Sequence, residues 1–143
     1  MHITRLGLLL AMLASCAPSS AEPPKPETCL DLTKGQPKAT FSGMLTVQLF
    51  AGQPNYESIA KGDAEEQAFI LELPRRTCAN DGEFIDASTT FDRVHLSAEG
   101  SQFLSVLSAA VGRNVTVRGE AFGSHTGHHH APLVLFVQEI SVR

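Results

Sequence analysis

Tryptophan is absent from this 143-residue chain, and tyrosine occurs once, at Tyr56. Nucleic-acid bases stack on large aromatic side chains, and the chain offers few of them. Basic residues are also few: 11 Lys and Arg stand against 15 Asp and Glu, which gives a formal net charge of −4. The sequence has no basic cluster of the kind that binds a polyphosphate backbone. We therefore expect no nucleic-acid partner.

The motifs of common hydrolases and nucleotide-binding enzymes are missing as well. The chain has no nucleophile elbow, no glycine-rich phosphate loop and no His-Glu-x-x-His zinc motif. No residue is therefore assigned a catalytic role. The remaining enzymatic hypothesis is a metal-dependent hydrolase that uses a metal-activated water, and it ranks third among the functions considered.

The N-terminus is typical of an export signal. Residues 6–14 form an apolar run that is too short to span a bilayer, which takes about 20 residues. The run ends in Leu13-Ala14-Ser15-Cys16, which resembles the lipobox of bacterial lipoproteins, where the Cys is acylated. We predict a signal peptide over residues 1–15 and lipidation at Cys16. An ordinary signal peptide cleaved after Ala21 is the alternative.

Both alternatives export the protein. Ala17 stands where an Asp typically retains lipoproteins in the inner membrane, so the resemblance implies an outer-membrane lipoprotein on the periplasmic side of a Gram-negative cell. Its contact with the membrane would be through the lipid anchor only. Residues 16–28 are rich in Pro, Ser and Ala and predict a tether. Residues 29–143 then form one small domain.

Two cysteines remain in that domain, Cys29 and Cys78. An even number of cysteines in an oxidising compartment favours one disulfide. Two free or metal-bound thiols are the alternative.

Hydrophobic periodicity predicts a mainly β domain with one helix. Strands are expected at residues 40–50, 67–73, 92–96, 114–122 and 133–142, the second ended by Pro74 and followed by an irregular segment, 75–90. A helix capped by Ser97 is expected between the third and fourth strands, with one face formed by Phe103, Leu104, Leu107, Ala110 and Val111.

This order of elements is that of the OB-fold, a five-stranded, partly open Greek-key barrel. Its ligand surface uses strands 2 and 3 together with the loops between strands 1–2 and 4–5. The loops at residues 51–66 and 123–132 occupy those two positions, so we expect Tyr56 and His128 to be neighbours. A different small barrel or an α+β meander is the alternative, and there the loops need not meet.

Two segments resemble a family of secreted bacterial domains of unknown function, number 4431 of that series. Gly52 to Asp63, with the run Asn55-Tyr56-Glu57-Ser58-Ile59, is similar to its first signature, and His125-Thr126-Gly127-His128-His129-His130 is similar to its second. Cys29 and Cys78 also match. Gln53 replaces a usual Pro, Ala131 stands where Thr is common, and residues 75–91 differ most. The resemblance implies an exported, single-domain protein and carries no activity.

The histidine-rich stretch is the strongest candidate for a working surface, because four imidazoles fall within six residues. One hypothesis is a site for Zn²⁺, Cu²⁺ or Ni²⁺, with a carboxylate from Glu57 or Asp63 completing the shell. Its candidate ligands are His125, His128, His129 and His130.

The hypothesis that we favour is a non-catalytic binding module for an envelope protein or a small ligand. Its contact residues would be Asn55, Tyr56, Glu57, Ser58 and Asp63 together with the histidines, and histidine protonation at about pH 6 to 7 would tune binding. A purely structural role, in which these side chains tie two long loops together, is the alternative. His95 is expected to be a structural residue on an outward strand face.

Overall fold

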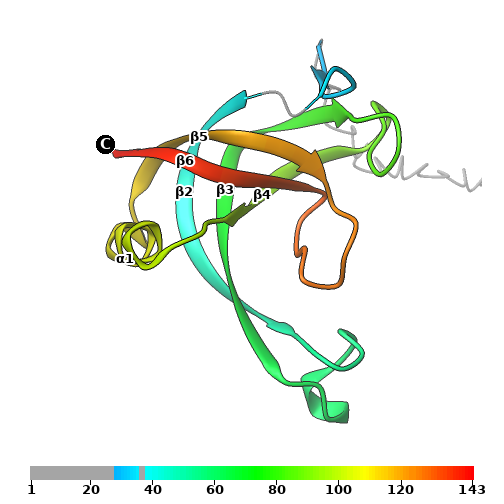
Figure 1. Ribbon diagram of the computed structural model, residues 1–143, viewed down its shortest axis with the longest axis vertical. Helices are drawn as coiled ribbons and strands as arrows, with labels where there is room; N and C mark the ends of the chain where they lie inside the picture. Colours follow the sequence, from blue (N-terminus) through cyan, green and yellow to red (C-terminus); the bar gives the residue numbers. More distant parts are fainter. Residues whose placement is uncertain (1–27, 36–37) are drawn as a thin grey trace, which may run out of the picture.

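The computed structural model describes residues 28–35 and 38–143, which form a small sheet that curls on itself, with one helix (Figure 1). The predicted signal peptide, Cys16 and almost all of the predicted tether lie outside the described residues. Among the residues that the structure describes, no helix has the length and apolar character needed to cross a bilayer.

The described residues form six strands, one α-helix and a single 3-10 turn. In chain order these are β1 (Leu30–Asp31), β2 (Lys38–Ala51), η1 (Ile59–Lys61), β3 (Glu65–Asn80), β4 (Thr90–Ser97), α1 (Ser101–Ala110), β5 (Asn114–Gly123) and β6 (Leu133–Val142).

Five of the strands close into a ring. Hydrogen bonding runs in the order β3-β2-β5-β6-β4, and β4 pairs with β3 to complete the circuit. All neighbours are antiparallel except β4 and β6, which run parallel. The ring of five strands is irregular and is not a regular closed barrel. Its strand order and the helix between β4 and β5 nevertheless confirm the predicted OB-like fold.

The interior of the ring is the main apolar core. Alternating residues of the strands fill it, among them Leu45, Leu71, Val117 and Leu135, each 0% exposed. In β5 the buried and exposed phases alternate as expected from its sequence, with Arg118 and Glu139 paired on the outside at 3.0 Å. The period of two therefore predicted which face of this strand points inward.

Gly43 marks the point where β2 changes partner. Residues 38–44 of β2 pair with β5, and residues 44–51 pair with β3. A Cβ atom at Gly43 would lie 2.1 Å from the carbonyl oxygen of Glu72, so only glycine permits this close approach. The outer half of the β2–β3 hairpin consequently extends away from the ring, and the β2–β3 loop lies below the ring in Figure 1.

β3, which corresponds to the strand predicted at residues 67–73, is much longer than predicted, because Pro74 does not end it. β3 continues to Asn80, and residues 75–80, which were expected to be irregular, belong to it. Its pairing with β2 stops at Glu72, and its register with β4 is interrupted between Glu72 and Thr77. Pro74 lies in this gap, where its missing N–H group removes no ladder hydrogen bond.

The helix begins later than predicted and buries a narrower face. Gly100 is its N-cap residue, so Ser97 ends β4 and caps no helix. Leu107 and Ala110 are buried and Phe103 packs against the core, but Leu104 and Val111 are 44% and 40% exposed. Phe103, Leu107 and Ala110, at positions i, i+4 and i+7, form one stripe that faces the core. Leu104 and Val111 lie beside this stripe.

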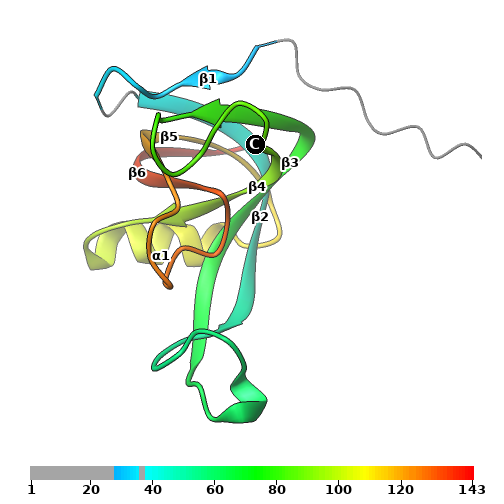
Figure 2. The same cartoon turned by 90° about the vertical axis from the view of Figure 1, so that its right-hand side faces the viewer.

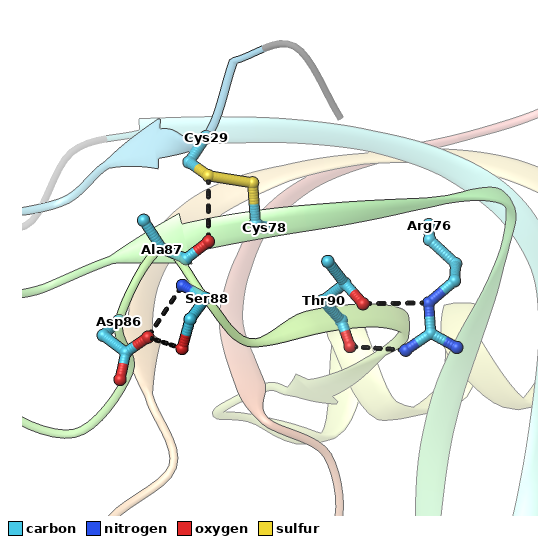
Figure 3. The surroundings of a disulfide bond; sticks show 7 residues. All are labelled: Cys29, Arg76, Cys78, Asp86, Ala87, Ser88 and Thr90. Atoms are coloured by element: carbon cyan, nitrogen blue, oxygen red, sulfur yellow. Dashed lines mark hydrogen bonds between the residues drawn. A yellow bond between two sulfur atoms is a disulfide. The ribbon is translucent and has the colours of Figure 1, made fainter. Parts of the chain in front are cut away.

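The short strand β1, which was not predicted from the sequence, attaches the start of the domain to β3. β1 pairs in parallel with the end of β3, Leu30 opposite Ala79 (Figure 2). Next to this pairing, Cys29 and Cys78 form the predicted disulfide, with their Cα atoms 4.6 Å apart (Figure 3). In Figure 2, β1 and the β2–β3 loop lie at opposite ends of the molecule.

Candidate functional site

The β2–β3 loop is organised around a buried carboxylate. Asp63 is 5% exposed, and its two oxygens accept hydrogen bonds of 2.8 to 3.1 Å from the backbone N–H groups of Asn55, Glu57 and Ser58 and from the Asn55 side-chain amide. The bonds from Ser58 and Glu57 are the main reason why the pKa of Asp63 lies below its usual value. An ionised Asp63 therefore fixes the loop that presents Tyr56.

Tyr56 joins this loop to the histidine-rich β5–β6 loop, residues 124–132. Its hydroxyl group lies 2.8 Å from Nε2 of His128, and the two rings meet edge to face with centroids 4.9 Å apart. The ring also packs on Gly127, where a Cβ atom would approach it to 2.5 Å. The predicted juxtaposition of Tyr56 and His128 is thus confirmed, and Gly127 is required for it.

Glu66, at the start of β3, binds two histidines of the facing loop. Both of its carboxylate oxygens lie 3.0 Å from Nδ1 of His128, and Oε1 lies 3.1 Å from Nε2 of His130. The Glu66 side chain is 26% exposed, whereas the His130 side chain is only 7% exposed. The chain Tyr56–His128–Glu66–His130 ties the two loops into one surface, which we call the Tyr–His network.

The histidine loop also covers a second, smaller apolar patch on the outside of the ring. Ile70 and Val134 are 0% exposed and lie opposite His95 on its two neighbouring strands, but neither belongs to the main core. His130 stacks on Phe50 with ring centroids 4.1 Å apart, and its backbone N–H donates to Nδ1 of His95. β6 is therefore covered on both faces near its start, as its continuous apolar sequence predicted.

The remaining two histidines extend this surface toward the β3–β4 loop. Nδ1 of His129 accepts a hydrogen bond from the His125 backbone, and the His125 ring lies 5.0 Å from that of Phe84. Asp81 holds the β3–β4 loop by accepting three backbone N–H groups there and that of Gly123 at the end of β5. An exposed Phe84 and the imidazoles thus form a row of neighbouring rings.

The predicted site residues meet in part. The structure brings Tyr56 together with His128, but Asn55, Glu57 and Ser58 serve the loop through their bonds to Asp63. Neither Glu57 nor Asp63 supplies the carboxylate at the histidines, which is Glu66. Within residues 28–35 and 38–143, no group of three or more His, Cys, Asp and Glu side chains is arranged to hold a metal ion.

Three residues that contribute to the site were not predicted from the sequence: Phe50, Glu66 and His95. Phe50 and Glu66 are direct cross-strand partners, and Glu66 shares the phase of Ala68 and Ile70, both buried. Glu66 could have been recognised as a carboxylate directly before a row of buried apolar residues on the same face of the strand. The predicted strand, residues 67–73, began one residue too late to include it. His95 does lie on the opposite phase from the inward residues of β4, but the histidine loop covers that face.

Burial and mutual repulsion keep some of these imidazoles neutral. Burial, followed by the neighbouring His130 and His129, lowers the pKa of His95 to about 4, and burial and His125 lower the pKa of His129. Burial alone would raise the pKa of Glu66, but hydrogen bonds from His128 and His130 outweigh it and bring the pKa below its usual value. At neutral pH the site therefore contains a charged Glu66 and an uncharged His95.

These shifts predict that acid destabilises the domain. The pKa of His95 is about 4 when folded against 6.5 ordinarily, so between those values the unfolded chain binds more protons and stability falls as pH falls. The lowered pKa of Glu66 acts in the same direction at the acidic end of this window. Urea unfolding at a series of pH values from about 7 to 4 measures the loss. His95→Gln should lose less stability than wild type across the window; an unchanged slope contradicts the assignment.

A family model described as "Domain of unknown function (DUF4431)" matches residues 93–141. The match agrees with the resemblance found in the sequence, over a segment that contains His95, α1 and the whole histidine loop. No curated protein matches the chain.

Among solved structures, the chain is similar to the crystal structure of a small single-stranded DNA-binding protein from Streptomyces coelicolor. The two are 17% identical, the match covers 74% of this chain and 94% of that chain, and the TM-score is 0.33. That protein is named for binding single-stranded DNA, and we withdraw the prediction of no nucleic-acid partner. That prediction counted Trp and Tyr as stacking rings and left out histidine, which also stacks on bases. Similarity at this level assigns no ligand to the chain.

Proposed function

We propose that the protein is an exported lipoprotein whose single domain is a non-catalytic binding module for an envelope protein. The partner would be held on the surface formed by residues 51–66 and 123–132, and the acylated Cys16 would tether the module to the periplasmic face of the outer membrane. The observation that supports this proposal best is the Tyr–His network, because it fixes two loops distant in sequence as one surface.

The network has the features of a binding surface. Tyr56 offers a partly exposed ring with a polar tip, and the His128 side chain beside it is 53% exposed. Tyrosine is enriched among the few interface residues that dominate binding energy. The side chains behind them are fixed, since Asp63 holds one loop and Glu66 holds the other. Prior ordering of this kind reduces the entropy that a partner must overcome on binding.

Affinity recovery from envelope extract tests the proposal. We compare the wild-type domain, a Tyr56→Ala/His128→Ala variant and an Arg118→Ala/Glu139→Ala control, which removes an exposed ion pair elsewhere on β5 and β6. Loss of two contact residues at the centre of an interface is expected to cost about 2 kcal/mol or more, or roughly thirtyfold in affinity. Proteins recovered by wild type and control should therefore be depleted with the loop variant. Equal recovery by all three removes these loops from the interface.

A further inference from the structure

Tyr56, His128 and Glu66 form a hydroxyl–imidazole–carboxylate chain. The Tyr56 hydroxyl lies 2.8 Å from Nε2 of His128, and Nδ1 of the same ring lies 3.0 Å from each oxygen of Glu66. Each imidazole nitrogen thus has one partner, and the two partners have different chemistry. A nucleophile next to a base, with the base oriented by a third group, is the arrangement that activates hydroxyl groups in proteins.

The carboxylate decides which nitrogen of a neutral His128 carries the proton. An ionised carboxylate only accepts hydrogen bonds, so the N–H group must be on Nδ1, where it donates to Glu66. Nε2 is then left with its lone pair directed at the hydroxyl of Tyr56, which donates to it. His130, which donates from Nε2 to the same carboxylate, holds Glu66 in place. His128 is therefore positioned as a base toward the tyrosine oxygen.

The tyrosine is held in an unusual conformation and is partly exposed to solvent. Its backbone φ angle is 59°, in the left-handed region that residues other than glycine seldom occupy. The loop bonds to Asp63 and the packing of Gly127 against the ring maintain this conformation. Backbone strain of this kind clusters at functional sites. Both Tyr56 and His128 are exposed enough for a small molecule to reach the hydroxyl oxygen.

We propose that Tyr56 is a covalent modification site that accepts an acyl group from an activated ester or thioester. The tyrosine oxygen attacks the acyl carbon and forms a C–O bond as the bond to the leaving group breaks. Its proton passes to Nε2 of His128 and from there to the leaving group. His128 acts as general base, and Glu66 is a positioning residue. The step does not depend on the partner proposed above.

The composition of the chain allows this reaction to be followed at one residue. Tyr56 is the only tyrosine and tryptophan is absent, so acylation of Tyr56 removes the tyrosine fluorescence of the protein. Trypsin releases Tyr56 in the peptide of residues 39–61, which contains no histidine and no lysine except its last residue. Acetylation found by mass within this peptide and fragmented to Tyr56 is thus separated from acetylation of imidazoles or amines.

The full chain is treated with p-nitrophenyl acetate, and the rate of acetylation at Tyr56 is measured. Because a positioned base contributes about 10²–10⁴-fold, His128→Gln should lower this rate by roughly 100-fold. Arg118→Gln, which breaks the exposed ion pair with Glu139 on β5 and β6 and lies outside both loops, should leave the rate unchanged. Glu66→Gln should give an intermediate loss and should shift the rise of rate with pH to lower pH, since it removes the charge beside His128.

Circular dichroism of each variant establishes that it is folded before rates are compared, and N-acetyl-tyrosinamide gives the rate of an unassisted phenol. The proposal is supported if folded wild type exceeds this reference and His128→Gln does not. It is overturned if Tyr56 reacts no faster than the free phenol, or if wild type and folded His128→Gln react equally. A loss in Glu66→Gln with an unchanged pH profile would overturn the role of Glu66 as a positioning residue.

Discussion

Asp63→Ala should release the β2–β3 loop and detach Tyr56 from His128. The substitution removes the acceptor for four N–H groups at once, three of them on the backbone of Asn55, Glu57 and Ser58. No short side chain replaces those acceptors, so these amides must turn to water. Amide hydrogen exchange at residues 55, 57 and 58 should accelerate by at least about tenfold, while the ring core keeps its protection.

The same variant should also change tyrosine fluorescence, because the Tyr56 hydroxyl loses its imidazole partner. Asp63→Asn should have a smaller effect, since it keeps one oxygen but turns an NH₂ group toward backbone donors. Glu57→Gln is the matched control, being an exposed acidic residue of the same loop. Unchanged exchange at these three amides in Asp63→Ala would show that the loop does not depend on the buried carboxylate.

Removal of the disulfide should destabilise the whole domain. Cys29 and Cys78 are separated by 49 residues, and a closed loop of that length reduces the entropy of the unfolded chain by an amount worth roughly 4 kcal/mol. β1 has only two residues in its ladder, so without the covalent link it has little to keep it on β3. Cys29→Ser/Cys78→Ser should therefore lower the urea-unfolding free energy by about 3 to 4 kcal/mol.

The disulfide lies next to β1, which is at the opposite end of the molecule from the β2–β3 loop that carries Tyr56 (Figure 2). Where the double variant is still folded, its Tyr56 environment should match that of wild type. A loss of less than about 1 kcal/mol would contradict the prediction, because it would mean that the link constrains the unfolded chain far less than the loop-closure model requires.

The sequence predicted β2 to β6, the helix and most of the inward-facing residues, because periodicity reports burial directly. Val47 and Leu49 share the phase of the buried Leu45 but are exposed, because this half of β2 extends away from the ring. β6 was predicted with its observed bounds, and β5 with the phase it shows. The extent of β3 could not be predicted in this way. Pro74 is a local signal that ends a strand, and only the register of both neighbouring strands shows that no ladder hydrogen bond requires an N–H group at this position. β1 is similarly short and depends on the disulfide beside it.

The sequence predicted which two loops form the candidate site, but not which strand side chains bind the histidines. Tyr56 and His128 were expected together from the positions of the two loops in an OB-like barrel. Glu66 and His95 come from strands, and their role arises because the histidine loop folds over the outer face of β3, β4 and β6. A loop of nine residues can take many paths, and the sequence does not encode which strand face it covers in any short-range pattern.

Nuclear Overhauser effects from the Tyr56 ring test the central claim most directly. Because the chain has one tyrosine, every ring proton signal assigned to tyrosine belongs to Tyr56. We predict cross-peaks from them to the Gly127 α-protons and to the His128 ring, and their loss in Asp63→Ala. Cross-peaks confined to residues of the β2–β3 loop would show that the two loops are separate in solution, and would contradict the shared surface.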